Sequence, residues 1–596
     1  MRFFRIAERR IVGDASVRGN ERGRGLISFI SNNAWLDGLS HVSMRARYLN
    51  EFQSIYIDNL NGDKYRTGKT TPDGRPDPSA FSTPQNREGI QVGTAIATLI
   101  RTSPARADGE IALRDLWGTH KLSHLDREAR REVEPEYGNL QPNPALGLPF
   151  AARTVSRAYA EWPRLPELFP QSYPGIKTSR DFLLIDIDRA VLEERMLKYH
   201  DPSITAAAFE ELVPGALTDG YMYPALQVRS ELVRRKYRPW QIRKYTYRPF
   251  DQRWIYWEPS TDLLRRKVED FTAQLTSHNT WLEARQRESG EVFSRGSIAG
   301  GLADNVGNGY SSFTPLRVLS GPSLLAPHGR LQENLSGEAA DFLNELEADY
   351  KQPSDLFFHG LAIIHTPRYR EENAGALLND WPRIPLPARR ELLTHSASLG
   401  RRLAELLDPE SELQLAGAWS FLARLSLPPE LPEGTPDRDQ KNAGRLAVTA
   451  GWGGRGQGET VMPRRGDARA REWTATERER IAGLAVAEGL TAEQTLELLG
   501  ERCVDVYLNG DAYWAAVPLR VWEYTLGGYQ VLKKWLSYRE EPLLGRPLRE
   551  DEARYVQQVV RRIAAILLMG PALDASYGAI LPEAGGLGAS GIDMAN

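Results

Sequence analysis

The sequence predicts a mixed fold, with an α/β region followed by α+β regions. Residues 26–32 (LISFISN), 54–60 (SIYIDNL) and 90–100 (IQVGTAIATLI) are short apolar runs, and a helical pattern over residues 35–52 separates the first two. Strand, helix, strand, loop and strand in this order are typical of the closing half of an α/β domain. Further along, isolated strands, a hairpin and several helices alternate irregularly, which favours an α+β arrangement with a helix-rich end.

Composition limits the classes of protein that this chain can belong to. Its 596 residues leave room for about three or four domains. The net charge is −3, so any contact with a polyanion must come from local clusters of cations. The single cysteine, Cys503, excludes a disulfide framework and a multi-cysteine zinc site, and it fits a reducing cytoplasm. No apolar run reaches about 18 residues and no secretory signal opens the chain, so we expect no membrane segment.

The first hundred residues indicate half of a sheet. The opening string MRFFRIAERRI predicts an amphipathic helix without a capping residue before it, because Phe3, Phe4 and Ile6 recur between arginines. The run at residues 26–32 lies between glycine and asparagine, which is typical of a buried parallel strand. No first strand with a glycine-rich turn precedes it, so we expect an opening half that is missing from this sequence.

Residues 234–257 (RRKYRPWQIRKYTYRPFDQRWIYW) interleave cations with aromatic rings. This mixture suits a nucleic-acid surface, because cations neutralise phosphates and rings stack on bases. It equally suits a half-buried strand pair whose arginines lie over aromatic rings. Arg248 and Arg253 are the best candidates for DNA contact, since arginine can hold a guanine edge or clamp a phosphate. The neighbouring aromatic residues are expected to be packing residues: Tyr247, Phe250, Trp254 and Tyr256.

The remaining segments predict a series of smaller elements. Residues 300–313 are expected to form an exposed, adaptable loop. His120 and His124 have helical spacing but lack a further ligand, so they are expected to be surface histidines and no metal site is predicted. Proline, glycine and charge dominate residues 426–471, which favours a linker or loose insertion.

The C-terminal part is predicted to be a hairpin among helices. Thr474 and Thr491 are placed to cap two helices over residues 474–499. Residues 504–519 form a hairpin pattern with Asn509-Gly510 as its turn. A last helix is expected over residues 552–569, ending at Gly570, and the glycine-rich tail after Tyr577 is expected to be disordered.

Several of these strings resemble type ISP restriction-modification enzymes. FFRIAERRI, GLISFISNNAWLDGLSHVSMRARYL, IYIDNLNGDK and GIQVGTAIATLIR are similar to the second half of their methyltransferase domain. YTYRPFDQRWIYW, LAIIHTPRYREENAGALLNDWPRIPLP and VWEYTLGGYQVLKKWLSYRE resemble their target-recognition and specificity regions. The second resemblance implies a strand at residues 361–365 (LAIIH). The resemblance implies the C-terminal half of a Rossmann-like methyltransferase sheet in residues 1–105, a mixed α+β target-recognition domain in 106–410, a linker in 411–471 and a C-terminal specificity subdomain in 472–596.

The resemblance also implies a function. The chain would bind double-stranded DNA and recognise a target sequence as part of a site-specific adenine-N6 DNA methyltransferase in the cytoplasm. S-adenosylmethionine would be the methyl donor, and no metal is implied. A separately encoded part with methyltransferase, helicase and nuclease functions is a possible partner. The alternative is a non-catalytic DNA-binding specificity module or a truncated gene product.

One departure from the family bears on catalysis. Neither Asn-Pro-Pro-Tyr nor Asp-Pro-Pro-Tyr occurs in the sequence, and no glycine-rich turn follows a first strand. We therefore assign no catalytic residue and predict that the chain alone is inactive. His365, Tyr369 and Arg370 form a catalytic-looking group by composition, but no nucleophile accompanies them, so an enzyme site there is not expected.

Two sets of site residues follow from the residues and the resemblance. Gly175, Thr178 and Asp181 belong to a segment resembling the Gly-x-x-Thr-x-Arg-Asp opening of the recognition region, where cations beside hydroxyls suit a phosphate contact. The DNA-contact candidates are Lys177, Arg180, Arg243, Lys244, Arg248, Arg253, Arg368, Arg370, Lys533 and Lys534. The rim of a catalytic cleft, at the carboxyl ends of strands, would include Asn32, Asp58 and Asn59, although solvated strand ends fit these residues as well.

Overall fold

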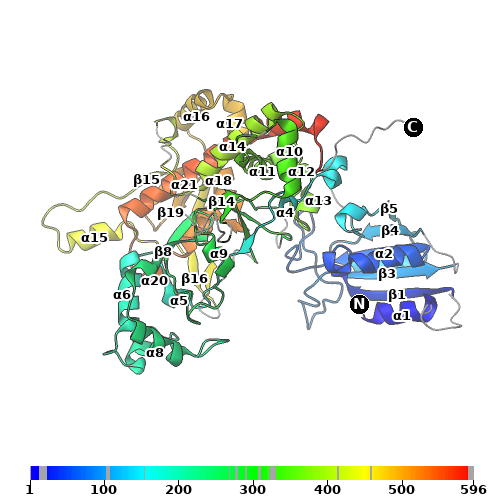
Figure 1. Ribbon diagram of the computed structural model, residues 1–596, viewed down its shortest axis with the longest axis horizontal. Coiled ribbons are helices and arrows are strands. Elements are labelled where there is room, and N and C mark those ends of the chain that lie inside the picture. The colour runs from blue at the N-terminus through cyan, green and yellow to red at the C-terminus, as the bar shows by residue number, and fades with distance from the viewer. Residues whose placement is uncertain are drawn as a thin grey trace. The chain divides into compact units, whose positions relative to one another are not determined.

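A computed structural model (Figure 1) describes residues 2–12, 23–102, 108–152, 155–267, 269–275, 279–288, 292–305, 310–319, 321, 330–348, 350–412, 415, 417–456 and 460–587. The chain forms two compact units. Unit 1 comprises Met1–Trp162, Gln286–Phe293 and Arg370–Arg383, and unit 2 comprises Pro163–Arg285, Ser294–Tyr369 and Ile384–Asn596. Mixed α+β architecture is confirmed, since both units combine sheets with helices.

Unit 1 is built on a five-stranded sheet with the order β1-β3-β2-β4-β5. Only β2 and β4 are parallel neighbours, and the other pairs are antiparallel. Because β3 runs against both of its neighbours, β1, β2 and β4 all end at one edge of the sheet. The elements are α1 (Arg2–Val12), β1 (Gly25–Asn32), α2 (Val42–Glu51), β2 (Ser54–Asn61), β3 (Thr94–Arg101), β4 (Glu110–Asp115), α3 (Lys121–Ala129), β5 (Gly138–Leu140) and α13 (Ala374–Leu377).

The core of unit 1 is aromatic. Phe4 of α1 packs on Phe29 of β1 with ring centroids 5.0 Å apart, and Trp35 and Tyr48 complete the cluster. The amphipathic N-terminal helix and the strands at residues 54–60 and 90–100 are confirmed, although the last begins at Thr94. The expected buried parallel strand at residues 26–32 is wrong in both respects. β1 pairs antiparallel with β3, and every second residue is exposed because one face of the strand carries no cover.

The first part of unit 2 joins two small sheets around one core. The four-stranded sheet β11-β10-β12-β6 and the three-stranded sheet β7-β9-β8 share a hydrophobic cluster that includes Tyr245, Ile255, Trp281 and Phe313. The strands are β6 (Tyr173–Pro174), β7 (Ile185–Asp186), β8 (Ile242–Arg248), β9 (Asp251–Tyr256), β10 (Trp281–Ala284), β11 (Ile298–Ala299), β12 (Ser312–Pro315), β13 (Arg317–Leu319) and β14 (Leu331–Glu333). The helices are α4 (Leu165–Leu168), α5 (Asp181–Leu184), α6 (Arg189–His200), α7 (Ala206–Leu212), α8 (Ala225–Arg235), α9 (Glu269–Ala273), α10 (Gly337–Leu346), α11 (Ser354–His365) and α12 (Pro367–Glu372), the last of which continues into unit 1.

The second part of unit 2 has a four-stranded sheet, β15-β20-β19-β18, among helices. Its strands, with those of two two-stranded sheets, are β15 (Arg424–Ser426), β16 (Gly453–Arg455), β17 (Val461–Pro463), β18 (Ala468–Glu472), β19 (Arg502–Tyr507), β20 (Tyr513–Pro518), β21 (Thr525–Leu526) and β22 (Tyr529–Gln530). The helices are α14 (Arg390–Leu407), α15 (Arg438–Gly444), α16 (Ala475–Ala487), α17 (Ala492–Leu499), α18 (Leu519–Glu523), α19 (Val531–Ser537), α20 (Glu541–Leu544), α21 (Glu550–Leu568) and α22 (Gly570–Ile580).

Local signals in this part are confirmed. Thr474 and Thr491 each accept a hydrogen bond from the backbone N–H three residues on and complete capping boxes at α16 and α17. β19 and β20 form the expected hairpin, and the Asn509 side chain accepts hydrogen bonds from the N–H groups of Asp511 and Ala512 within its turn.

Three other expectations are wrong. Residues 361–365 belong to the buried helix α11 rather than to a strand, because a short apolar run has no periodicity that separates the two. Residues 426–471 contain α15, β16, β17 and β18, and β18 pairs with β19 over five residues, so this stretch is not simply a linker. Helix α22 continues through Tyr577 to Ile580. The expected exposed loop at residues 300–313 is wrong for residues 302–305, which are buried, and for residues 312–313, which belong to β12. Residues 306–309 of that loop and residues 588–596 of the tail lie outside the described residues.

Within the described residues one helical segment, Glu550–Glu583, is long and apolar enough by length and composition to cross a membrane. This is weak evidence, because core helices of soluble proteins pass the same test. Here 56% of the apolar window is buried inside the structure, and α21 packs against α14, α17, α18 and β20.

Strand β9 is tied to α19 by a buried ionic contact. The carboxylate of Asp251, the first residue of β9, lies 2.7 Å from Arg253 and 2.8 Å from Arg539, and its side chain is 2% exposed. Burial by itself raises the pKa of Asp251, but the two guanidinium charges outweigh burial and lower the pKa to about 2. The expected strand pair at residues 234–257 is therefore present as β8 and β9, and Arg253 forms an ion pair with Asp251.

The contact of α11 with α14 predicts the effect of a single methyl group. A Cβ added at Gly400 of α14 would lie 1.8 Å from the carbonyl oxygen of Phe358, whereas a Cβ at Gly483 of α16 would meet nothing within 4 Å. Gly400→Ala should lower the free energy of unfolding by about 2 kcal/mol or more, since the helices must separate. Gly483→Ala, the control, should be neutral or stabilising by roughly 0.5–1 kcal/mol. Urea unfolding followed by circular dichroism measures both, and equal effects would contradict this packing.

Removing the charge of Asp251 should destabilise unit 2. Asp251→Asn leaves Arg253 and Arg539 uncompensated and should cost about 3–5 kcal/mol at pH 7. Asp467→Asn, the control, removes an exposed pair with Arg469 and should change the free energy of unfolding little, because solvent screens exposed charges. Because the pKa of Asp251 is about 2 in the folded protein against 3.8 ordinarily, its contribution is complete above about pH 4 and is lost as the pH falls towards 2. Unfolding free energies at pH 7 and pH 3 test this, and an unchanged pH dependence in Asp251→Asn would refute it.

Candidate functional site

Three cations and three tyrosines alternate in a closed cycle at the junction of β8, β9, β22 and α19. We call this set, comprising Arg248, Tyr247, Arg253, Tyr538, Lys534 and Tyr529, the cation–tyrosine ring. The guanidinium carbons of Arg248 and Arg253 lie 4.1 and 3.8 Å from the centroid of Tyr247. Arg253 and the ammonium of Lys534 lie 4.2 and 4.7 Å from Tyr538. Lys534 and Arg248 lie 5.2 and 5.5 Å from Tyr529, which closes the cycle.

Carboxylates balance the arginines of this ring. Asp304 pairs with Arg248 at 2.5 Å, and Asp251 pairs with Arg253. Hydrogen bonds between β8 and the segment at residues 302–304 bring Asp304 beside Arg248, through the N–H of Thr246 to Leu302 O and the N–H of Asp304 to Thr246 O. The arginine side chains are only 11% and 10% exposed. Direct base contact by Arg248 or Arg253 remains a prediction, and the structure shows that both side chains are engaged inside the protein.

An exposed cationic surface lies on β8, next to the ring. Arg243 and Lys244 are both exposed, and Arg243 has no ion-pair partner among the described residues. Lys244 pairs with Glu410. Trp254, its cross-strand partner on β9, lies 5.9 Å from the Lys244 ammonium and 5.6 Å from the guanidinium of Arg189. Cations close to a half-buried indole are suited to a phosphate and a base ring.

The other predicted DNA contacts fall in different surroundings. Arg180 is buried over the ring of Tyr223 and donates to the carbonyl of Leu263 at 2.9 Å, so it ties α5 to a loop. Lys177 and Lys533 are half-buried without a described ion pair. Arg368, exposed in unit 2, lies 5.7 Å from the ring of Tyr577, and Arg370, in unit 1, lies 5.7 Å from the ring of Phe293.

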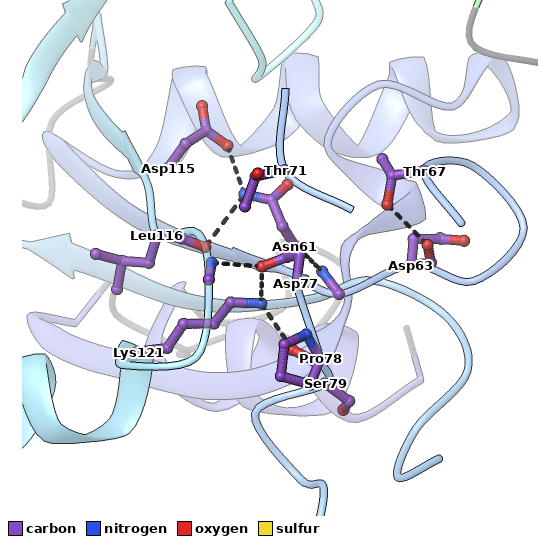
Figure 2. Close-up of polar contacts among 12 residues, drawn as sticks. Asn61, Asp63, Thr67, Thr71, Asp77, Pro78, Ser79, Asp115, Leu116 and Lys121 are labelled. Atoms are coloured by element: carbon purple, nitrogen blue, oxygen red, sulfur yellow. Dashed lines mark hydrogen bonds and ion pairs between the residues drawn. The ribbon is translucent and has the colours of Figure 1, made fainter. Parts of the chain in front are cut away.

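In unit 1 a row of polar side chains lies where β1, β2 and β4 end. Asn33 donates to Asn59 at 3.0 Å, and Asn59 donates to Asp115 at 2.7 Å. Asn61 donates to the same carboxylate at 3.2 Å and to the carbonyl of Leu116 (Figure 2). These amides and the carboxylate hold the strand ends together, because each is bonded to a neighbouring strand.

A buried ion pair fixes the loop beyond these strand ends. Lys121, at the start of α3, lies 2.6 Å from Asp77 and donates to the carbonyl of Pro78, as Figure 2 shows. The N–H groups of Gly62 and Gly118 also donate to Asp77, each at 2.7 Å. Burial lowers the pKa of Lys121 against the opposing charge of Asp77. Three donors thus converge on the side chain of Asp77, which ties the loop after β2 to the start of α3.

The three predicted rim residues lie in different surroundings. Asn59 lies at the strand end, and Asn32 is exposed beside it, with its side chain accepting from the N–H of Ala34. Asp58 is buried and bonded to Arg114 and to the hydroxyl of Tyr137, so it is not a solvated strand end. It remains a prediction that the rim of a catalytic cleft includes Asn32, Asp58 and Asn59.

No cofactor site is formed by the groups at this edge. The amides and Asp115 are bonded to one another, and no glycine-rich turn follows a strand here, so the residues present do not fit S-adenosylmethionine. Among the described residues no cluster of three or more histidine, cysteine, aspartate or glutamate side chains could hold a metal ion.

Sequence reasoning missed the acidic partners and two of the tyrosines of the ring. Asp304 and Tyr529 lie 56 and 281 positions from Arg248, and no local pattern links them. Asp251 stood in the predicted patch, but its role was not recognised. Its position two residues before Arg253 was the one available signal, because residues i and i+2 of a strand point to the same face.

The comparisons with known proteins agree with this architecture. The Type ISP C-terminal specificity domain matches residues 167–431 and 472–561, more than half of the chain and all of the cation–tyrosine ring. No curated protein matches the sequence.

Three solved structures share the fold at low sequence identity. A nuclease-deletion mutant of the Type ISP restriction-modification enzyme LlaGI, in complex with a DNA substrate mimic, has 15% identity and a TM-score of 0.53 over 93% of this chain and 46% of that one. The ATP-dependent Type ISP enzyme LlaBIII bound to DNA has 17% identity and a TM-score of 0.56 over 94% and 33%. The DrdV–DNA complex has 17% identity and a TM-score of 0.57 over 96% and 51%.

The chain thus spans between one third and about one half of the length of these proteins. With a specificity-domain match over most of unit 2 and the fold of these enzymes throughout, the chain belongs to the type ISP restriction-modification family.

Proposed function

We propose that this chain recognises a DNA target within a type ISP restriction-modification system, as part of a site-specific adenine-N6 DNA methyltransferase. The observation that carries the proposal is that the specificity-domain match includes β8, β9 and α19, where exposed and buried cations are gathered. The DNA in the similar structures belongs to those proteins and supports the same ligand class here. A cytoplasmic location is part of this proposal.

The exposed cations supply the contact with the DNA backbone in this proposal. Because the net charge is −3, the affinity must come from local groups such as Arg243 and Lys244 on β8 and Arg234 and Lys236 before it, all exposed. Trp254, which lies near both Lys244 and Arg189, offers a ring for stacking. The buried Arg253 and Arg180 do not contact the DNA in this proposal. They contribute to binding through the shape and the electrostatic potential of the protein surface.

Methyl transfer needs groups that this chain does not contain. Unit 1 would be the closing half of the methyltransferase sheet, and a flipped adenine would meet the edge where Asn59 and Asp115 lie. S-adenosylmethionine would be held mainly by residues of another segment or polypeptide, since no glycine-rich turn follows a first strand here, and the catalytic Asn-Pro-Pro-Tyr, which is also absent, would come from the same source. A non-catalytic specificity module is the second candidate function, and the same absence favours it.

Strand β1 is a suitable place for such a segment to join. It is the edge of the sheet, and its eight residues contain no charge or proline to block pairing. Leu26 and Ile30 are 58% and 55% exposed on it, and Phe3 of the adjoining α1 is 74% exposed. Doubly wound α/β sheets cover both faces, so an added strand with its helix would bury this surface.

Binding of duplex DNA is the primary test. In fluorescence anisotropy, the chain should bind a labelled duplex at low salt. Changing both Arg243 and Lys244 to alanine should weaken binding roughly tenfold. The same change should reduce the slope of log affinity against log salt concentration by about 1.8, the value expected for the loss of two phosphate contacts. Lys198→Ala with Arg554→Ala, two exposed cations on other helices, is the matched control and should change little. No binding by the unaltered chain at low salt would sink the proposal. Methyl transfer by the chain alone would contradict the prediction that the chain is inactive without the missing motifs.

The surface of β1 can be tested by reconstitution. Mixed with a type ISP methyltransferase segment that carries Asn-Pro-Pro-Tyr, the chain should co-elute and restore methyl transfer to duplex DNA. Leu26→Lys with Ile30→Lys should abolish both, because charge is placed on the pairing strand. Leu122→Lys, at a residue 59% exposed on α3, is the control and should leave both intact. Reconstitution unaffected by the β1 changes would rule out this surface, and DNA binding without any reconstitution would favour the non-catalytic module.

A further inference from the structure

Lys534 is the one cation of the cation–tyrosine ring without a carboxylate among the described residues. Arg248 has Asp304, and Arg253 shares Asp251 with Arg539. Among the described residues the ammonium of Lys534 contacts the rings of Tyr529 and Tyr538 and the carbonyl oxygen of Val461, which lies 3.5 Å away. Cation–π contacts attract the charge but do not neutralise it. Asp181 accepts from the Tyr247 hydroxyl at 2.9 Å, so within the described part of the chain the three cations of the ring and Arg539 face three carboxylates, which leaves one positive charge in excess.

This excess charge lies in surroundings that favour an anion. Lys534 is half-buried, and Arg248 and Arg253 both reach tyrosine rings that it also touches. The Nε atom of Arg248 is buried without a hydrogen-bond partner. Like charges held close in a poorly solvated site repel one another, and an oxyanion bound by Lys534 would relieve this repulsion.

We propose that the cation–tyrosine ring is a phosphate-binding site in which Lys534 contacts the oxyanion and Arg248 and Arg253 maintain the positive potential around it. Lysine suits this role, since its ammonium is a compact point charge with three donors. A phosphate group is the shared chemistry, and its assignment to the DNA backbone rests on the proposed function. Arg248 and Arg253 are positioning residues in this site, because their carboxylates already occupy them.

The site couples phosphate binding to pH. The groups acting on the charge of Lys534 are Arg248, Arg253 and Asp251 of the β8–β9 hairpin, with Tyr529 of β22 and Tyr538 at the end of α19. Of the other elements packed on α19, β17 contributes the Val461 carbonyl. Burial first, and then the two arginines, lower the pKa of Lys534 to about 8. Only the protonated ammonium binds phosphate well, so affinity should fall as the pH rises through about 8.

The test compares pH profiles of three proteins. A labelled duplex is titrated by anisotropy at pH 7 and pH 9 into the unaltered chain, Lys534→Arg and Lys534→Met. The unaltered chain should lose affinity about tenfold between the two, the size of one charged contact. Lys534→Arg should bind equally at both values, because arginine stays charged, and Lys534→Met should bind about tenfold more weakly at pH 7 without further loss. Lys441→Met, on the exposed helix α15, is the matched control and should keep the profile of the unaltered chain.

A second arm separates the source of the phosphate. Inorganic phosphate should raise the thermal unfolding temperature of the unaltered chain at pH 7 and not that of Lys534→Met. The same pH profile in Lys534→Arg as in the unaltered chain, or equal stabilisation of Lys534→Met by phosphate, would overturn the site. Stabilisation by phosphate that depends on Lys534, with duplex affinity that does not, would keep the oxyanion site and refute its assignment to DNA. A chain that binds no duplex but passes the phosphate arm would refute the proposed function alone.

Discussion

The buried carboxylate of Asp251 is the constraint on which the recognition surface depends. It joins Arg253 on its own strand to Arg539 at the end of α19, 288 residues along the chain. Two guanidinium groups with one carboxylate are stable inside a protein only when geometry and hydrogen bonding compensate for lost hydration. Once α19 is fixed in this way, Lys534 and Tyr538 come to lie against β8 and β9, and the cation–tyrosine ring can form.

The basic-aromatic patch therefore has two layers with different tasks. Its buried arginines are held by Asp251 and Asp304 and by tyrosine rings, so they organise the hairpin from within. Its exposed cations, Arg243 and Lys244, face solvent on the same strand. Neighbouring residues of a strand point to opposite faces, and β8 carries two exposed cations in succession, so both faces of the strand are open to solvent at that point. Packing thus accounts for the buried arginines of the patch, and the proposed nucleic-acid contact is assigned to the exposed cations.

In unit 1 the polar groups are paired with one another, in contrast to the cation–tyrosine ring with its excess positive charge. At its strand ends the polar groups satisfy one another, from Asn33 through Asn59 to Asp115, and Asp77 with Lys121 closes the adjoining loop. Such a saturated edge provides rigid support but few free donors or acceptors. The unsatisfied feature of this unit is instead apolar, the uncovered face and edge of β1 with Leu26 and Ile30. This is why the proposed catalytic role assigns the reactive groups to another segment.

Much of the local structure could be predicted because its causes are local. Thr474 and Thr491 cap helices by accepting a hydrogen bond from the N–H three residues later, and Asn509-Gly510 forms the turn of a hairpin. Residues close in sequence are therefore enough to specify these features. The run LAIIH in α11 was mistaken for a strand, since continuous burial erases the periodicity that tells helix from strand. The direction of β1 was wrong for a related reason, because apolar content does not reveal which way a partner runs.

The sequence by itself determined the family, the mixed α/β and α+β character, and the concentration of cations and rings between residues 234 and 257. Only the tertiary structure decided which cations are internal and which are available to a ligand. That choice depends on carboxylates from distant positions, Asp304 beside Arg248 and Asp251 beside Arg253 and Arg539, and on the absence of one beside Lys534 among the described residues. Charge pairing acts over a few ångströms in space, and separation along the chain does not encode it.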